Sequence, residues 1–149
     1  MTSAKKPHTT ALHAAFPDAH PPAEVVPARK GDAERDDVRA AFAGHKWTAL
    51  SPATIKAHRD VLPLLASAAF RYYLPAWMTA APGDDDVTDA VVYAVAPVKG
   101  KLAKWQEERI GGFTAAQRKA IAAFLERVVK EAGPGENLDA EGALAQYQE

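Results

Sequence analysis

The feature that most constrains this chain is an apolar stripe of helical spacing that recurs between closely spaced prolines and glycines. Residues 114–133 carry its clearest example, with side chains three, four and seven positions apart on one face. These side chains are Gln117, Ile121, Phe124, Leu125 and Val128. A strand with one buried face would instead alternate apolar and polar residues with a period of two. The pattern therefore predicts short amphipathic helices that bury their stripes against one another.

Start and stop signals bound these helices. Thr114 and Gln117 form a capping box, in which each side chain satisfies a free backbone N–H group, and Gly133 ends that helix. Ser51 and Ser67 stand where two other helices need an N-cap. Together these signals predict an all-α fold, a compact array of about six short helices. The expected ranges are 32–44, 51–62, 67–81, 83–97, 99–112 and 114–133.

Residues 83–97 admit two interpretations. Val91, Val92 and Tyr93 have strand propensity. A helical stripe runs through the same segment, and three aspartates precede it where a helix N-terminus favours negative charge. We expect a helix capped by aspartate rather than a calcium site, because the aspartate spacing does not fit the twelve-residue calcium-binding loop. The stripe comprises Val87, Ala90, Val91, Ala94 and Val95.

The two ends of the chain differ from its middle in composition. Residues 1–30 contain five of the eleven prolines, so we expect an extended, partly disordered arm with a short helix at 11–16. Residues 31–133 are expected to form the helical domain. Residues 134–149 begin after a glycine stop, and we expect a tail with a weak helix at 139–148.

Composition restricts the class of protein. A chain of 149 residues is the length of one domain, and the lack of cysteine excludes a disulfide framework, a thiolate metal site and a cysteine nucleophile. No apolar run approaches the ~20 residues that cross a bilayer, and no signal peptide is visible. We therefore expect a cytoplasmic protein that does not associate with a membrane. The net charge of −1 gives no support for long-range attraction to nucleic acid.

The sequence carries no strong catalytic, metal-binding or cofactor motif. His45 and His58 fall on different expected helices, and no His-Glu-x-x-His motif is present, so we expect no metal site. Ser51 and Ser67 are explained as caps, and neither lies in a Gly-x-Ser-x-Gly motif. No glycine-rich loop of the phosphate-binding kind occurs. We expect no catalytic residues and no cofactor.

Basic residues surround an aromatic ring once, in residues 99–109. Trp105 among lysines and an arginine is a feature of proteins that stack nucleic-acid bases. Trp105 also follows Leu102 by three positions, so we expect both side chains to face the core, with Ile110 beside them. This second interpretation weighs against a nucleic-acid partner.

The segment 68–77, AAFRYYLPAW, combines aromatic, basic and helix-breaking residues. One helical face of it is expected to enter the core. Pro75 either kinks this helix or separates two helices. Arg71, Tyr72 and Pro75 are expected to lie off the core face. Arg71 and Tyr72 are our candidate partner-binding residues, and a local salt bridge or hydrogen bond is the alternative. The expected core face comprises Phe70, Tyr73, Leu74, Trp77 and Met78.

Three stretches, 45–58, 64–81 and 112–128, resemble a bacterial family of uncharacterised domains. Members of that family carry a Ser-Pro-Glu-Ala-Phe-Arg-Tyr-Tyr-Leu-Pro-Ala core, of which this chain retains AFRYYLPA. The similarity covers about residues 33–132. This chain lacks the Pro and Glu that reinforce two helix starts in the family. It has ASAAF where the family has Ser-Pro-Glu-Ala-Phe, and Ala115–Ala116 where Pro and Glu would follow Thr114. The resemblance implies a helical domain and no established activity, so no functional residue is carried over.

Two classes of function lead from the sequence, and a nucleic-acid accessory protein that uses residues 99–109 is a third option. The first is a non-enzymatic protein-binding domain of the bacterial cytosol, such as an immunity or antitoxin-like protein that masks a partner. It follows from the small size and the lack of a catalytic or cofactor motif. The second is a small hydrolase or transferase whose site is assembled only in the fold. A pocket with converging Asp, His or Arg side chains would favour this second class.

Overall fold

The computed structural model describes residues 7–27 and 33–148, and within these ranges every regular element is helical. The all-α prediction is confirmed. The α-helices are α1 (Pro7–Ala15), α2 (Ala33–Phe42), α3 (Pro52–Ala57), α4 (Ser67–Ala80), α5 (Asp85–Val95), α6 (Ala103–Gly111), α7 (Ala115–Ala132) and α8 (Leu138–Tyr147). Three short 3₁₀ helices lie between them, namely η1 (Trp47–Ala49), η2 (Arg59–Leu64) and η3 (Gly100–Leu102).

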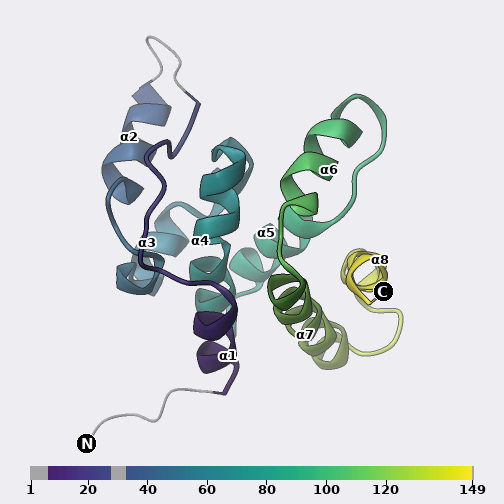
Figure 1. Ribbon diagram of the computed structural model, residues 1–149. Helices are drawn as coiled ribbons and strands as arrows, with labels where there is room; N and C mark the ends of the chain where they lie inside the picture. The colour runs from purple at the N-terminus through teal and green to yellow at the C-terminus, as the bar shows by residue number, and fades with distance from the viewer. Residues whose placement is uncertain (1–6, 28–32, 149) are drawn as a thin grey trace, which may run out of the picture.

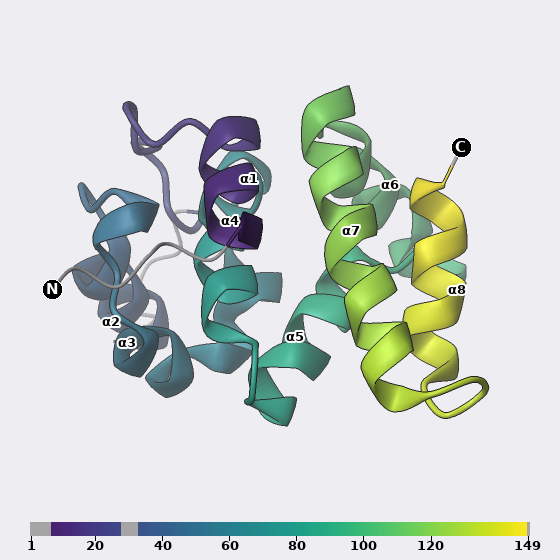
Figure 2. The ribbon, with the colours of Figure 1, turned by 90° about the horizontal axis from the view of Figure 1, so that it is seen from below.

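Helix α4 lies at the centre of the array (Figure 1). It packs against α1, α3, α5 and α6, and also against η1 and η2. Helices α2 and α3 lie on one side of it, and α6, α7 and α8 lie on the other (Figures 1 and 2). Helix α5 connects the two sides. Helix α7 packs instead against α8 and α1, so neighbouring helices cover one another's apolar stripes.

The core face predicted on α4 is confirmed, and its five side chains are all buried. Phe42 of α2 stacks on Trp77 with ring centroids 5.5 Å apart. Pro75 is buried too, so its expected place off the core face is wrong. The alternative that a helix ends at Pro75 is also wrong, because α4 continues to Ala80. Apolar burial on both sides of Pro75 favours one continuous helix over a break.

The helix starts are partly as predicted. Ser51 caps α3, with its hydroxyl accepting from the Thr54 N–H at 3.2 Å. Ser67 is not a cap, because α4 has Ala66 at its N-cap position. The Ala66 N–H donates to the Val25 carbonyl at 2.9 Å, so the arm holds the chain at this point. The expected helix 51–62 is divided at His58 into α3 and η2.

Residues 85–95 of the expected range 83–97 form helix α5, and the helical interpretation is confirmed. The Asp84 carboxylate accepts from the Val87 N–H at 3.1 Å and caps the helix. Val87, Val91 and Val95 are completely buried along one face. The capping box of α7 is also present, with both reciprocal bonds between Thr114 and Gln117.

Helix α6 faces the core with a different side from the one predicted. Leu102 is 59% exposed and Trp105 is 39% exposed, so the expectation that both face the core is wrong. Ile110 is buried as predicted, together with Gln106 and Arg109. Arg109 explains why this side of α6 faces the core. Its guanidinium donates to the carbonyls of Leu62 in η2 and of Leu65, which follows η2, and it also lies over the ring of Trp105. A buried cation needs such acceptors, and only this side of α6 reaches them.

Both ends of the described chain pack on the helical array. Helix α1 contacts α4 and α7, and the Trp47 indole N–H donates to the Phe16 carbonyl at 2.9 Å. Residues 7–10, for which we expected disorder, belong to α1, and residues 1–6 lie outside the described residues. Helix α8 lies along α7 (Figure 2) and also contacts α5. The Tyr147 hydroxyl donates to the Val95 carbonyl at 2.6 Å and connects α8 to the end of α5.

Candidate functional site

Arg71, the first predicted partner-binding residue, contacts the end of helix α6. Its guanidinium donates to the carbonyl of Arg109 at 3.0 Å and to that of Glu108 at 3.3 Å. The last carbonyls of an α-helix have no partner within the helix and carry partial negative charge. Arg71 therefore caps α6 from a neighbouring helix. These hydrogen bonds within the chain are of the kind that the sequence left open as an alternative, but they join residues 37 and 38 positions apart rather than local neighbours.

Gly112 lies directly against this guanidinium. A Cβ atom added at Gly112 would lie 2.5 Å from the Arg71 Cζ, which is closer than nonbonded carbon atoms approach. The glycine after α6 therefore leaves space for the cation that caps the helix.

Tyr72, the second predicted residue, connects the arm to η1. Its hydroxyl donates to the Asp18 carbonyl at 2.6 Å and accepts from the Trp47 N–H at 3.3 Å. Burial raises the pKa of Tyr72, and the backbone bond from Trp47 partly opposes that rise. Arg71 and Tyr72 are each half-buried, and their polar groups already have partners in this chain. A direct role for them in partner binding stays a prediction.

A surface that the sequence did not predict lies over α5, α6 and the start of α8. Two adjacent depressions of about 290 Å³ and 310 Å³ share Tyr93 and Val98 in their walls. Trp105 lines the first depression and Leu138 lines the second. We call these four residues the Tyr93 surface. Tyr93 is 71% exposed and Leu138 is 73% exposed.

Large exposed apolar side chains are concentrated at this place. Five of them occur among the described residues, and four form the Tyr93 surface. The fifth, Leu102, lies in η3 between Val98 and Trp105 along the chain. Scattered apolar residues are normal on a surface, whereas a gathering of this kind marks an interaction site.

Acidic side chains border the Tyr93 surface on one side. Asp139 lines the depression that contains Tyr93 and Leu138, and Asp89 precedes Tyr93 by one helical turn. Partial burial raises the pKa of Asp89, and the negative charges of Asp85, Asp86 and Asp139 raise it further. These carboxylates therefore repel one another, and a neighbouring cation would relieve the repulsion.

The buried Arg109 side chain contacts Trp105 of the Tyr93 surface. Its guanidinium lies between the rings of Phe70 and Trp105, at 4.4 Å and 4.5 Å from their centroids. It donates to the carbonyls of Leu65 at 2.6 Å and Leu62 at 2.9 Å. Burial lowers the pKa of Arg109 to about 10, with a smaller contribution from Arg71. The group remains cationic at neutral pH, so Trp105 is held in place by a cation–π contact.

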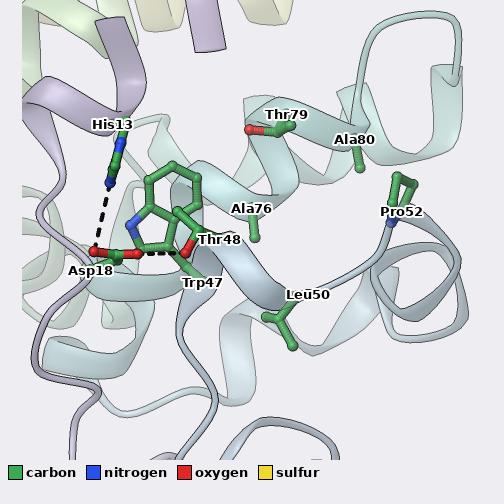
Figure 3. A pocket seen from close by; sticks show the side chains of 9 residues that line it. All are labelled: His13, Asp18, Trp47, Thr48, Leu50, Pro52, Ala76, Thr79 and Ala80. Carbon is green, nitrogen blue, oxygen red and sulfur yellow. Dashed lines mark hydrogen bonds and ion pairs between the residues drawn. The ribbon is translucent and has the colours of Figure 1, made fainter. Parts of the chain in front are cut away.

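A separate pocket of about 320 Å³ lies between the arm, η1 and α4 (Figure 3). One end is polar, since His13, Asp18 and Thr48 point toward one another there (Figure 3). The Thr48 hydroxyl donates to the Asp18 carboxylate at 2.5 Å, and His13 Nε2 lies 3.6 Å from its other oxygen. The remaining wall is largely apolar. It comprises Trp47, Leu50, Pro52, Ala76, Thr79 and Ala80.

The order of these three polar groups differs from a nucleophilic triad. In such a triad the histidine lies between the hydroxyl and the carboxylate and takes the hydroxyl proton. Here Asp18 lies between Thr48 and His13. The bond from Thr48 lowers the pKa of Asp18, which makes this carboxylate a weak base. The arrangement is suited to binding rather than to activation of the Thr48 hydroxyl.

Sequence reasoning missed both places for identifiable reasons. The Tyr93 surface depends on the rotation of α6, which helical spacing alone does not determine. Asp89 and Tyr93 were visible as an exposed pair four residues apart, on the side opposite the valine stripe. The pocket brings together residues about thirty positions apart, and no local pattern signals it.

The described residues contain neither a cluster of metal ligands nor a membrane-spanning helix. In residues 7–27 and 33–148, no group of three His, Asp or Glu side chains is placed to hold a metal ion. His45 and His58 take no part in such a group there. None of the helices in these ranges has both the length and the apolar character to cross a bilayer.

Comparison with known proteins identifies a family but no characterised relative. The sequence model of a family of unknown function, DUF6714, matches residues 26–148, which is more than half of the chain. The chain therefore belongs to that family. No curated protein and no solved structure matches it.

Proposed function

We propose that this member of a family of unknown function is a non-enzymatic protein-binding domain of the bacterial cytosol. In the most specific form of the proposal it masks a partner protein, as an immunity or antitoxin-like protein does. The observation that carries the proposal is the concentration of exposed large apolar side chains on the Tyr93 surface. Tyr and Trp side chains, such as Tyr93 and Trp105 here, are enriched among the few residues that dominate the binding energy of protein interfaces.

The charges around the Tyr93 surface indicate the chemistry of the partner. Asp139 lines one depression, and Asp89, one helical turn before Tyr93, is repelled by it. Arg59 and Asp60 of η2 line the other depression. A partner with an apolar anchor and adjacent Lys or Arg side chains would fill a depression and neutralise these carboxylates. Complementary charge of this kind accelerates association and excludes partners of the wrong sign. We therefore expect the contacting face of the partner to be apolar at its centre and basic at its edge.

Affinity purification with matched variants tests this function. Tagged wild-type protein, Tyr93→Asp and Ala40→Asp would each be expressed in the native host and purified under the same conditions. Ala40 is exposed on α2, so its variant adds the same charge on a different face. We expect a stoichiometric partner with the wild type and with Ala40→Asp, and loss of that partner with Tyr93→Asp.

Two outcomes would contradict the proposal. One is a partner retained equally by all three proteins, because the Tyr93 surface would then not be the contact. The other is a purified protein that dimerises through this surface, detected as a dimer that Tyr93→Asp converts to a monomer in gel filtration. A second copy would then cover the surface instead of a different protein.

A further inference from the structure

The pocket between the arm, η1 and α4 has the composition of a site for a small organic cation. Its polar end presents one carboxylate, Asp18, and the residues that line it include no lysine or arginine. The rest of the wall is apolar or aromatic, and Trp47 forms part of it (Figure 3). Ligand pockets typically combine an apolar wall with a few placed polar groups, in volumes from about 300 Å³ upward.

Asp18 is negatively charged and retains the capacity to accept another hydrogen bond. The hydroxyl of Thr48 lowers the pKa of this carboxylate, so Asp18 is ionised at neutral pH. An ionised carboxylate offers about four lone-pair positions. Thr48 occupies one on Oδ2, and His13 Nε2, an ion-pair neighbour 3.6 Å from Oδ1, approaches one of the two positions on that oxygen. The Asp18 Oδ1 atom therefore has room for a charged N–H donor.

The backbone around Asp18 holds the carboxylate in position. The Asp18 carbonyl accepts from the Tyr72 hydroxyl at 2.6 Å, which fixes this part of the arm to α4. The Trp47 indole N–H is bonded to the Phe16 carbonyl, so the ring is fixed beside the carboxylate. Groups that are held before binding lose little conformational entropy when a ligand arrives. A fixed carboxylate beside a fixed indole is also the pairing that attracts organic cations.

The geometry points to a binding site for an alkylammonium group, with its nitrogen at Asp18 and its apolar body against Trp47, Leu50 and Ala76. The charge of Asp18 selects the cation, and the apolar wall selects a ligand with a hydrocarbon body. Free small amines and the lysine side chain of a protein share this chemistry. The site is separate from the Tyr93 surface, so it does not depend on the proposed protein-binding function.

Titration by NMR tests the site with three probes at pH 8, where an ordinary histidine is neutral. The probes are cyclohexylmethylammonium, the uncharged cyclohexylmethanol of the same shape, and Nα-acetyl-lysine methylamide. We expect the ammonium to shift the indole N–H resonance of Trp47, with a dissociation constant of about 1 mM or tighter. The alcohol should bind at least about tenfold more weakly, because it lacks the charge.

Two variants assign the effect to Asp18. Asp18→Asn keeps the shape of the side chain and removes its charge, so affinity for the ammonium should fall at least about tenfold. Asp37→Asn, at an exposed position on α2, should bind like the wild type. Binding of Nα-acetyl-lysine methylamide would identify a protein lysine as the source, and binding of the free amine alone would identify a small molecule.

The proposal is overturned by any of three results. The first is no detectable binding of the ammonium at concentrations up to about 10 mM. The second is equal binding of the alcohol and the ammonium, and the third is unchanged affinity in a folded Asp18→Asn. If Asp18→Asn does not fold, the comparison of ammonium and alcohol on the wild type decides the question alone.

Discussion

At the scale of single residues, polar groups on α4 connect segments that are distant in the sequence. Arg71 caps α6, and Tyr72 connects the arm to η1. Tyr73 is buried and its hydroxyl is 2.6 Å from the Phe42 carbonyl and 2.8 Å from that of His45. Each bond joins segments about thirty or more residues apart, so each is a tertiary contact rather than a local one. Replacing a donor whose carbonyl has no second partner leaves a buried or half-buried acceptor unsatisfied, which is costly, whereas the Phe42 carbonyl also accepts from the His45 N–H at 3.0 Å.

Tyr73 makes the stability of the protein sensitive to alkaline pH. Burial raises its pKa to about 12, whereas an unfolded tyrosine titrates near ~10. The stabilisation is complete below pH ~10 and is lost as the pH rises through ~12, because only the unfolded state releases the proton between these values. We expect a loss on the order of 2 kcal/mol from this group over that window. Urea denaturation at several pH values measures it. Tyr73→Phe should be less stable at pH 8 but should lose less stability per pH unit above 10, and equal slopes would contradict the assignment.

Gly112 and Arg71 provide a second test at this scale. Gly112→Ala places a methyl group in the guanidinium of Arg71, so Arg71 must leave the two α6 carbonyls. We expect a loss of about 1–2 kcal/mol in the free energy of unfolding. In an Arg71→Ala background the same substitution should cost only a few tenths of a kcal/mol. A double-mutant cycle by urea denaturation gives the coupling, and additive losses would show that the contact has no energetic role.

At the scale of elements, the predictable features were those with local causes. The caps of α3, α5 and α7 depend on residues within one turn, and all three are present. The rotation of α6 depends on Arg109, whose acceptors Leu62 and Leu65 are more than forty residues away. Pro75 was misplaced for a similar reason, since the burial around it comes from other helices. Spacing within a helix predicts which residues share a face, but only the neighbouring elements determine which face is buried.

Helix α8 was expected to be weak, and its packing leads to a prediction of its own. Its buried residues are Ala140, Ala143 and Tyr147, and it lies along α7. A protein that ends at Gly133 would expose the matching face of α7 and lose the Tyr147 bond to Val95. We expect this truncation to lower the melting temperature by more than ~10 °C or to abolish cooperative unfolding, because several kcal/mol of apolar burial are lost. Removal of Glu149 alone is the control. A truncated protein with the wild-type melting temperature would show that α8 is dispensable.

At the scale of the whole molecule, the two candidate binding places lie in different parts of the array. The cation pocket belongs to the arm, η1 and α4, and the Tyr93 surface belongs to α5, α6 and α8. Helix α4 lies between them and packs against both α5 and η1. The proposed partner would therefore cover one side of the array and leave the pocket open on the other. The central claim is that a protein partner docks on the Tyr93 surface.

Hydrogen–deuterium exchange on the purified complex tests that claim most directly. We expect the partner to slow amide exchange in residues 89–105 and at the start of α8, while α2 and α3 exchange as in the free protein. When Tyr93→Asp is mixed with the same partner, amide exchange should not change in any segment. Protection confined to α2 and α3, with residues 89–105 unchanged, would contradict the account.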